Sequence, residues 1–326
     1  MSIKDINQET EKEYTISSDI PQDEFEWIGQ DVNALGEMKR PSVSFWRDAW
    51  FRLKKDKIAM IFLGILVFIV LGAILVPMFS PYDISSMDVT HTNMGLMSKI
   101  DGALHLFGTD DLGRDMFVRV WYGGRISMII AFSAVFINVI VGIVYGGISG
   151  YFGGKIDNVM MRIVEIIGGI PYLLIVILLM VVMKPGIATM IIAYSTVGWT
   201  GMARLVRGQV IQLKEQEYII ASQTMGGSSA RIIAKHLIPN LLPIVIVNLT
   251  LSIPSAIFTE AFLSFIGLGV PVPEASWGTL CNDGIVVFQN YPLQLIIPGL
   301  FISITMLSFN LLGDSLRDCL DPKLRR

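Results

Sequence analysis

The chain has 326 residues, of which 52% are hydrophobic and 16% are charged, and its formal net charge is -3. Together with a mean hydropathy of +0.59, these values fit a membrane protein better than a soluble globule. The net charge identifies no partner by itself, and we expect no nucleic-acid partner.

The chain begins with a polar segment, residues 1–38, which has no sustained apolar period and which we expect to be mobile. It is followed by SFWRDAWFRLKKDK, whose aromatic and apolar residues lie near one helical face with cations on the other. This pattern indicates either a helix at the cytoplasmic membrane interface or a basic flank that orients the next segment. The basic flank explains the cations but not the apolar face, which consists of Phe45, Trp46, Ala49, Trp50 and Leu53.

Apolar segments long enough to cross a membrane dominate the rest of the chain, since a crossing helix needs roughly 20 apolar residues. The first is too long and lies too far from the amino terminus to be a cleaved signal peptide. We therefore predict an all-α, polytopic membrane protein with six transmembrane helices: Ile58–Phe79, Ile126–Ile148, Ile163–Met183, Ile187–Ala203, Leu241–Thr259 and Leu295–Gly313.

The positions of Lys and Arg predict the orientation, because cations collect on the cytoplasmic side. With both termini cytoplasmic, most cations fall inside, including the clusters at residues 52–57 and 204–214. The residues that stay outside are Lys99, Arg114, Arg119 and Lys184, with Arg125 at the border. Cys281 is then outside and Cys319 inside, so they cannot form a disulfide, and His91, His105 and His236 lack metal-ligand spacing.

Ionisable residues away from the basic clusters offer little chemistry. On the outer segment, Asp110, Asp111, Arg114 and Asp115 form a cluster that we interpret as surface ion pairs, with Gly108 and Gly113 permitting turns. Glu165 and Glu260 lie near predicted helix ends, where a carboxylate can reach water. Helix breakers within the predicted spans mark kinks or close contacts: Gly168, Gly169, Pro171, Pro243, Pro254 and Pro298.

Nucleotide hydrolysis by this chain is not expected. The sequence has no G-x-x-x-x-G-K-[ST] phosphate loop, and Gly153-Gly154-Lys155 is followed by Ile156, which lacks the hydroxyl needed for magnesium. We expect no catalytic residues, no metal site and no cofactor in this chain.

The segment EYIIASQTMGGSSARIIAKHLIPN, residues 217–240, is a charged insert between two apolar segments. Its pattern predicts a short helix over Glu217–Met225, a sharp, tightly packed turn at Gly226, and a second helix that stops at Pro239. Such an insert either rests on lipid headgroups or transmits motion to a soluble partner. The candidate contact residues are Glu217, Tyr218, Ala221, Ser222, Met225, Gly226, Arg231 and Pro239.

This insert resembles the EAA loop of permease subunits of binding-protein-dependent ABC importers. Ala221, Gly226 and Pro239 match the pattern at its spacing, whereas Ile220, Ser222, His236 and Ile238 depart from it. The stretches FGTDDLGRDMFVRVWYGGRIS, EAFLSFIGLGVPVPEASWG and NLLGDSLRDCLDPKL are similar to segments of C-type dipeptide and oligopeptide permeases.

The resemblance implies the type I ABC importer permease fold and a set of partners. These are a second, B-type permease subunit, two cytoplasmic ATPases that bind ATP and magnesium, an extracytoplasmic peptide-binding protein, and the lipid of a prokaryotic cell membrane. The insert then couples the ATPases to the bundle, and the binding protein docks near Glu274, Ser276 and Trp277. Oligopeptides are the expected cargo, with dipeptides, nickel and glutathione as alternatives.

Two other classes of function compete with an importer subunit. A proton-coupled carrier predicts charges at the membrane midplane and an inverted repeat, and a membrane sensor predicts a soluble output domain. The importer hypothesis divides the chain into a cytoplasmic segment (1–57), the first span with its outer segment (58–123), a five-helix core (124–313) with the coupling loop (213–240), and a cytoplasmic tail (314–326).

Overall fold

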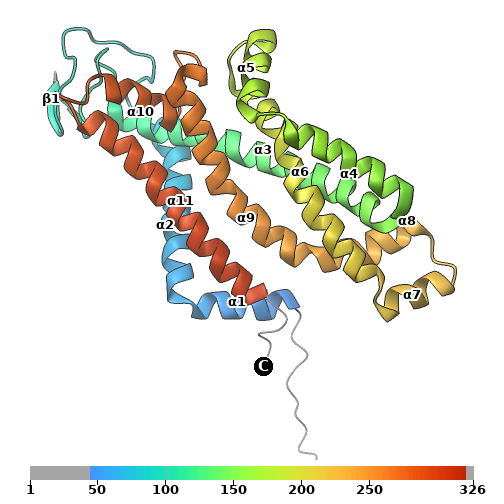
Figure 1. The fold of residues 1–326 in the computed structure, drawn as a ribbon. Coiled ribbons are helices and arrows are strands. Elements are labelled where there is room, and N and C mark those ends of the chain that lie inside the picture. Colours follow the sequence, from blue (N-terminus) through green and yellow to red (C-terminus); the bar gives the residue numbers. More distant parts are fainter. Residues whose placement is uncertain (1–44, 101, 321–326) are drawn as a thin grey trace, which may run out of the picture. The chain divides into compact units, whose positions relative to one another are not determined.

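The computed structural model describes residues 45–100 and 102–320, so the expectations for residues 1–44 and 321–326 lie outside the described residues. Helices dominate, and one small hairpin interrupts them (Figure 1). In chain order the elements are α1 (Phe45–Lys55), α2 (Lys57–Phe79), β1 (Ser98–Ile100), β2 (Ala103–His105), α3 (Met116–Phe152), α4 (Gly154–Gly169), α5 (Tyr172–Met183), α6 (Ile187–Lys214), α7 (Glu217–Thr224), α8 (Ser229–Ile232), η2 (Ile233–Leu237), α9 (Ile238–Leu263), η3 (Ser264–Leu268), α10 (Trp277–Val286) and α11 (Leu293–Leu320).

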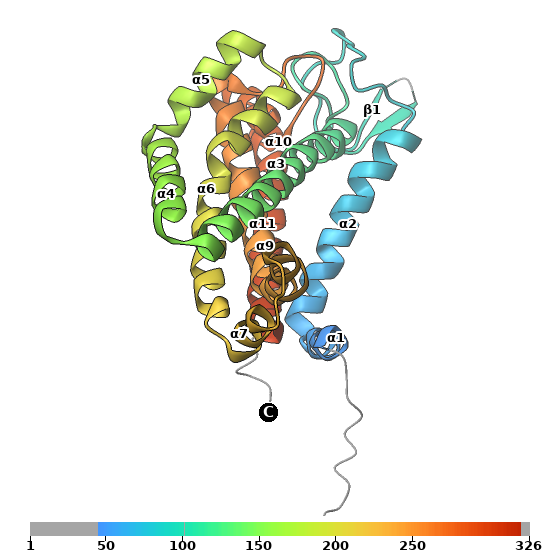
Figure 2. The same cartoon turned by 90° about the vertical axis from the view of Figure 1, so that its right-hand side faces the viewer.

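The long helices run between two ends of the bundle. The end that carries α1, α7 and the carboxyl end of α11 lies opposite the end that carries the β1–β2 hairpin and α10 (Figures 1 and 2). Among the described residues, four helices are long and apolar enough to cross a membrane: α2, α3, the continuous run Ser229–Leu268 and α11. The chain is therefore a multi-pass membrane protein.

The predicted count of six transmembrane helices is not fully confirmed. All six apolar segments lie in helices, but α4 and α5 qualify only as a pair, bent by 79°. Within the described residues, α6 is not apolar enough to count as a membrane-crossing helix, because its carboxyl half carries Arg204, Arg207 and Lys214. Composition alone therefore supports up to five crossings.

The bend between α4 and α5 lies where Gly168, Gly169 and Pro171 predicted a kink. Helix α4 ends at Gly169, and Pro171 precedes the first residue of α5. Proline cannot donate a backbone hydrogen bond and excludes the preceding residue from the helical region. In contrast, Pro243 and Pro254 lie inside α9, and Pro298 lies inside α11.

Helix α3 packs closely along α6 through glycines one turn apart. A Cβ atom at Gly142 would lie 2.5 Å from the Met202 side chain, and one at Gly146 would lie 2.3 Å from the Ala203 carbonyl oxygen. A Cβ atom at Gly150 would likewise lie 2.8 Å from the Arg207 carbonyl oxygen. Small residues at this spacing let two helix backbones approach, which favours packing between membrane helices.

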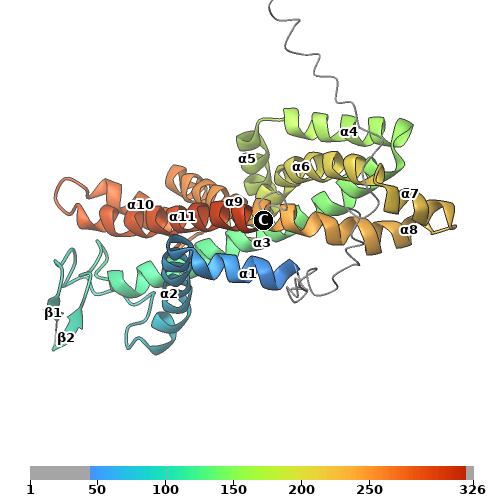
Figure 3. The ribbon, with the colours of Figure 1, turned by 90° about the horizontal axis from the view of Figure 1, so that it is seen from below.

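Helix α1 lies across the end of α2 (Figures 1 and 3). The predicted helix is confirmed, but its apolar face is divided: Ala49 and Leu53 are buried, whereas Trp46 and Trp50 remain about half exposed. Asp56 begins α2 by accepting hydrogen bonds from the backbone of Ile58 and Ala59. The exposed tryptophans fit an interfacial helix better than a simple basic flank.

Candidate functional site

The charged insert forms a helix, a turn and the beginning of a membrane helix. Helix α7 covers Glu217–Thr224, which confirms the predicted short helix to within one residue. The chain then turns at Gly226, whose φ of +81° confirms the predicted sharp turn. The Ser228 hydroxyl begins α8 by accepting a hydrogen bond from the Arg231 backbone.

The prediction that the second helix stops at Pro239 is wrong. Helix α8, η2 and α9 form one continuous helical run, and Pro239 lies in the first turn of α9. A proline inside a helix lacks a donor and crowds the carbonyl four residues earlier. The wider turn of η2 accommodates it, with the Ile238 backbone N–H donating to the Ile233 carbonyl.

The insert has a buried side that anchors it and an exposed side. Ile219, Ile232 and Leu237 are fully buried in the core. Met225 is 82% exposed and Ile220 is 50% exposed. Of the predicted contact residues, Ser222 is half-buried, and the exposed ones are Glu217, Tyr218, Ala221, Met225, Gly226, Arg231 and Pro239.

A polar cluster fixes the helix that leads into α7. The Asp157 carboxylate of α4 accepts two hydrogen bonds from the Arg207 guanidinium of α6, with Nη2 at 2.6 Å from Oδ2. The Ser149 hydroxyl of α3 donates to the same carboxylate, and Lys214 Nζ donates to the Gly150 carbonyl at 3.2 Å. Helices α3, α4 and α6 are thus connected where α6 approaches α7, so a displacement of α7 acts on several helices together.

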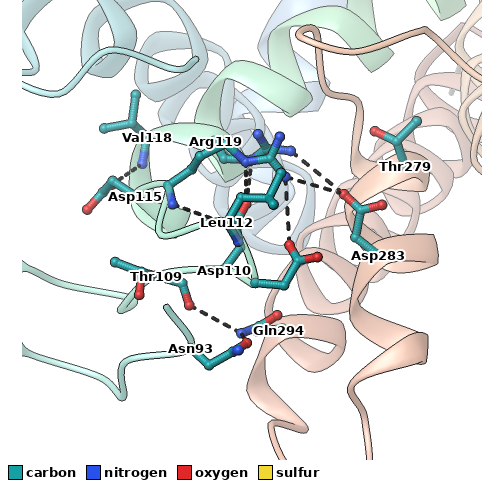
Figure 4. A network of polar contacts seen from close by, with 12 residues as sticks. Asn93, Thr109, Asp110, Leu112, Asp115, Val118, Arg119, Thr279, Asp283 and Gln294 are labelled. Atoms are coloured by element: carbon teal, nitrogen blue, oxygen red, sulfur yellow. Dashed lines mark hydrogen bonds and ion pairs between the residues drawn. The ribbon is translucent and has the colours of Figure 1, made fainter. Parts of the chain in front are cut away.

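The clustered charges of the outer segment are not surface ion pairs, which corrects the interpretation from sequence. Asp110, Arg114, Asp115 and Arg119 are each at most 5% exposed, whereas the Asp111 side chain is 51% exposed. Figure 4 shows Asp110 at the centre of this network. Its carboxylate accepts from Arg114 Nε at 2.6 Å and lies 3.4 Å from Arg119 Nε. The turns at Gly108 and Gly113 are confirmed, each with a φ of +76°.

Partners distant in the sequence complete this network. The Asp283 carboxylate of α10 lies 3.8 Å from Arg119 Nη2 and 4.0 Å from Arg114 Nη2. Burial raises the pKa of Asp283, and the two guanidinium groups partly oppose this shift. Gln294 of α11 donates to the Asn93 side chain at 2.9 Å and to the Thr109 carbonyl. The outer segment is therefore a folded cap bound to α10 and α11.

Two of the three residues predicted to dock a binding protein lie in the interior. Ser276 and Trp277 are fully buried, and Trp277 Nε1 donates to the Val120 carbonyl at 2.8 Å. The Ser276 hydroxyl begins α10 as a capping residue. A surface role for these two side chains is therefore wrong, because they have no exposed atoms to offer a partner. Glu274 is half-buried and stays a docking prediction.

The prediction that Glu260 reaches water is also wrong. The residue is 2% exposed, and its carboxylate accepts hydrogen bonds from Ser127 Oγ at 2.6 Å and Ser264 Oγ at 2.8 Å. These contacts connect α3 with α9 and η3. In contrast, the Glu165 side chain is 62% exposed and pairs with Arg162, so its contact with water stays a prediction.

The fold and the insert define a class: a polytopic helical membrane protein that presents an anchored helix at one end of its bundle and a folded cap at the other. Comparison with known families then identifies it, since residues 139–326 match the model of the binding-protein-dependent transport system inner membrane component. Residues 44–96 match the N-terminal TM domain of oligopeptide transport permease C. The chain belongs to this family of inner membrane components, as the resemblance implied.

Individual relatives support the same family. The chain is 50% identical to the dipeptide transport system permease protein DppC of Bacillus subtilis, over 93% of this chain and 94% of the relative. It is also 50% identical to the oligopeptide transport system permease protein OppC of that organism, over 94% of this chain and 99% of the relative. The identity to OppC of Escherichia coli K12 is 43%, over 86% of this chain and 92% of the relative.

Among solved structures, the inward-facing MetNI methionine ABC transporter has a chain with a similar fold. The TM-score is 0.51 at 19% identity, and the match covers 63% of this chain and 98% of that one. This likeness confirms the ABC importer permease fold.

Proposed function

We propose that this chain is a transmembrane permease subunit of an ATP-driven importer of oligopeptides. Membership of the permease family supports the class, and the relatives are named for oligopeptide and dipeptide transport. The names of the relatives support dipeptides as cargo as well as oligopeptides, and nickel and glutathione are further alternatives. Glu260 is buried, but it lies in the last turn of α9 and accepts hydrogen bonds from the hydroxyls of Ser127 and Ser264. These contacts favour a structural role, and membership of the permease family argues against a proton-coupled carrier.

The observation that carries this proposal is the exposed face of α7 on an anchored base. Partner ATPases bind ATP and magnesium, and one of them receives α7 in a groove, contacting Ala221, Met225 and their neighbours. Closure of the ATPases moves α7, and the Asp157–Arg207 contact passes the movement to α3, α4 and α6. The bundle then switches between two openings as a rigid assembly.

The remaining partners follow from this assignment. A second, B-type permease completes the pathway, and a peptide-binding protein docks on the outer end near Glu274. Both termini lie in the cytoplasm of a prokaryotic cell, and the exposed tryptophans of α1 contact lipid headgroups. This chain itself supplies no covalent chemistry.

The experiment compares two exposed alanines, Ala221 in α7 and Ala188 at the distant, amino-terminal end of α6. Ala221→Trp places a bulky side chain on the exposed face of α7, whereas Ala188→Trp makes the same change in the first turn of α6. We expect Ala221→Trp to reach the membrane normally, to lose the co-purifying ATPases and to abolish ATP-dependent peptide uptake. Ala188→Trp should keep all three, and retention of ATPases and uptake by Ala221→Trp would refute the coupling role.

A further inference from the structure

A polar cavity lies within the helical bundle and shares no residue with the insert or the outer cap. It has a volume of about 300 Å³ and is formed by α3, α6 and α9. Its polar side chains are Asn138, Tyr194, Asn248 and Ser252, and Gly198 and Gly201 widen it from α6. No Asp, Glu, Lys, Arg or His is among the described residues that form it.

Asn138 indicates that the cavity is built to receive a polar group. The residue is 6% exposed, and its buried side-chain oxygen has no hydrogen-bond partner among the described residues. Gly198 makes room for this amide, since a Cβ atom there would lie 2.3 Å from Asn138 Nδ2. Leaving a buried acceptor without a partner costs about 1–3 kcal/mol, so a bound ligand or water is needed to offset it.

The side chains that α9 contributes to the cavity keep some hydrogen-bonding capacity. Asn248 Nδ2 donates to the Ile244 carbonyl at 3.0 Å, and its side-chain oxygen remains free to accept. The Ser252 hydroxyl donates to the Asn248 carbonyl at 2.6 Å and can still accept from a ligand. The donors are therefore satisfied within α9, and the acceptors that remain can bind a donor on a polar ligand or water.

We infer that this cavity binds the main chain of the cargo peptide during its passage, an inference that rests on the proposed function. Side-chain amides donate and accept, as peptide groups do, so Asn138 and Asn248 can pair with cargo C=O and N–H groups alike. The absence of charge among the described lining residues gives no preference for acidic or basic cargo. The volume falls at the lower end of the range for ligand pockets, about 300–1,000 Å³, which suits a short length of extended chain.

Two substitutions test the cavity in different ways, one by filling it and the other by removing a polar group. Gly201→Leu fills it, and a Cβ atom at Gly201 meets no heavy atom within 4 Å, so the change introduces no clash at that atom. Asn138→Leu removes the unpartnered amide while keeping a similar size. The matched control is Gly64→Leu in α2, another exposed helical glycine with no heavy atom within 4 Å of its Cβ position.

Uptake of neutral, acidic and basic tetrapeptides is measured in cells, together with membrane abundance and recovery of the purified complex. Loss of one hydrogen bond in a transport intermediate corresponds to about a tenfold effect. We expect Asn138→Leu and Gly201→Leu to lower uptake of all three peptides by about that factor, with a normal complex, and Gly64→Leu to have no effect. A photoreactive side chain at position 201 should also cross-link to a labelled tetrapeptide.

The outcomes separate this inference from the proposed function. ATP-dependent peptide uptake by the unaltered complex, with normal uptake by both cavity variants, would overturn the cavity site alone. Absence of peptide uptake by the unaltered complex would overturn the proposed function instead. Loss of the partner permease from the Gly201→Leu complex would show that a partner helix fills the cavity, and loss confined to one charge class would show recognition of cargo side chains; either result overturns main-chain binding.

Discussion

Two adjacent glycines form the turn after α7, and each is required for a different reason. Gly226 has a φ of +81°, but a Cβ atom there would meet no heavy atom within 4 Å. Gly227 lacks a positive φ, but a Cβ atom there would lie 2.7 Å from the Ser222 carbonyl oxygen. The tight packing expected at Gly226 is therefore found at Gly227, and backbone conformation alone restricts Gly226.

This difference makes a prediction about residue type at Gly226. Valine is strained at positive φ by roughly 1 kcal/mol or more, whereas asparagine tolerates that conformation better. We expect Gly226→Val to insert normally but to lose peptide uptake and ATPase recovery, because α7 is displaced. Gly226→Asn should retain most of both, and Ser229→Ala should change little. If the valine and asparagine variants behaved alike in the uptake assay, backbone strain would not be the cause.

Cys281 makes a poor reporter of membrane topology. Burial and then the nearby Glu260 carboxylate raise the pKa of its thiol to about 12. Maleimides react with the thiolate, whose population at neutral pH falls as the pKa rises. We expect a hydrophilic maleimide to label Cys281 far more slowly than a cysteine placed at Val89, which is 75% exposed.

The pH dependence of labelling gives the sign of this effect. The rate at Cys281 should rise about tenfold per pH unit over the whole accessible range, because the pKa lies above it. The rate at Val89→Cys should level off near the ordinary thiol pKa of about 8.5. Equal rates and equal pH profiles, measured by mass spectrometry on the purified protein, would contradict the raised thiol pKa of the half-buried Cys281.

At the scale of elements, the sequence predicted the helices and turns that depend on neighbouring residues. The short helix α7, the turn at Gly226 and the break at Pro171 follow from residues a few positions apart, and all three were predicted. The outer cap could not be predicted in this way, because Gln294 and its partner Asn93 are 201 positions apart. The glycines of α3 are a further local signal: Gly142, Gly146 and Gly150 recur every four residues, the spacing that favours close helix packing.

The contact between α4 and α6 makes a prediction at this scale. The Asp157 side chain is 11% exposed and the Arg207 side chain 34%, so removing one partner leaves a poorly hydrated charge. We expect Asp157→Asn to lower the unfolding free energy by about 1–3 kcal/mol, seen as a lower melting temperature of the complex. Peptide uptake should fall more than ATP hydrolysis, because α6 no longer moves with α3 and α4.

Helix α4 also offers the matched control for that experiment. Arg162 and Glu165 form an ion pair whose side chains are 75% and 62% exposed, and exposed pairs contribute about 0–1 kcal/mol. Glu165→Gln should therefore leave melting temperature and uptake unchanged. An equal loss in both variants would indicate a general effect of removing a carboxylate from α4, and the connecting role of Asp157 would fail.

For the whole molecule, hydropathy underestimates how many helices run between the two ends of the bundle. A window of hydropathy measures contact with lipid, and a helix packed against protein needs fewer apolar residues. Helix α6 packs along α3 and carries Arg204 and Arg207 in its carboxyl half, yet it runs between the same two ends as its neighbours (Figures 1 and 2). The apolar segment Ile187–Ala203 nevertheless lies within this helix, as the sequence predicted.

The orientation of the bundle is the remaining prediction at this scale. Met225 follows α7 and is 82% exposed, whereas Val89 belongs to the outer segment at the opposite end and is 75% exposed. The cations at the α1 and α7 end favour a cytoplasmic location for that end. With Cys281 and Cys319 replaced by serine, a membrane-impermeant maleimide should label Val89→Cys in intact cells. Met225→Cys should react only after the cells are permeabilised. The reverse pattern would invert the molecule in the membrane and would place α7 where no cytoplasmic ATPase can reach it, so this experiment tests the orientation on which the coupling role depends.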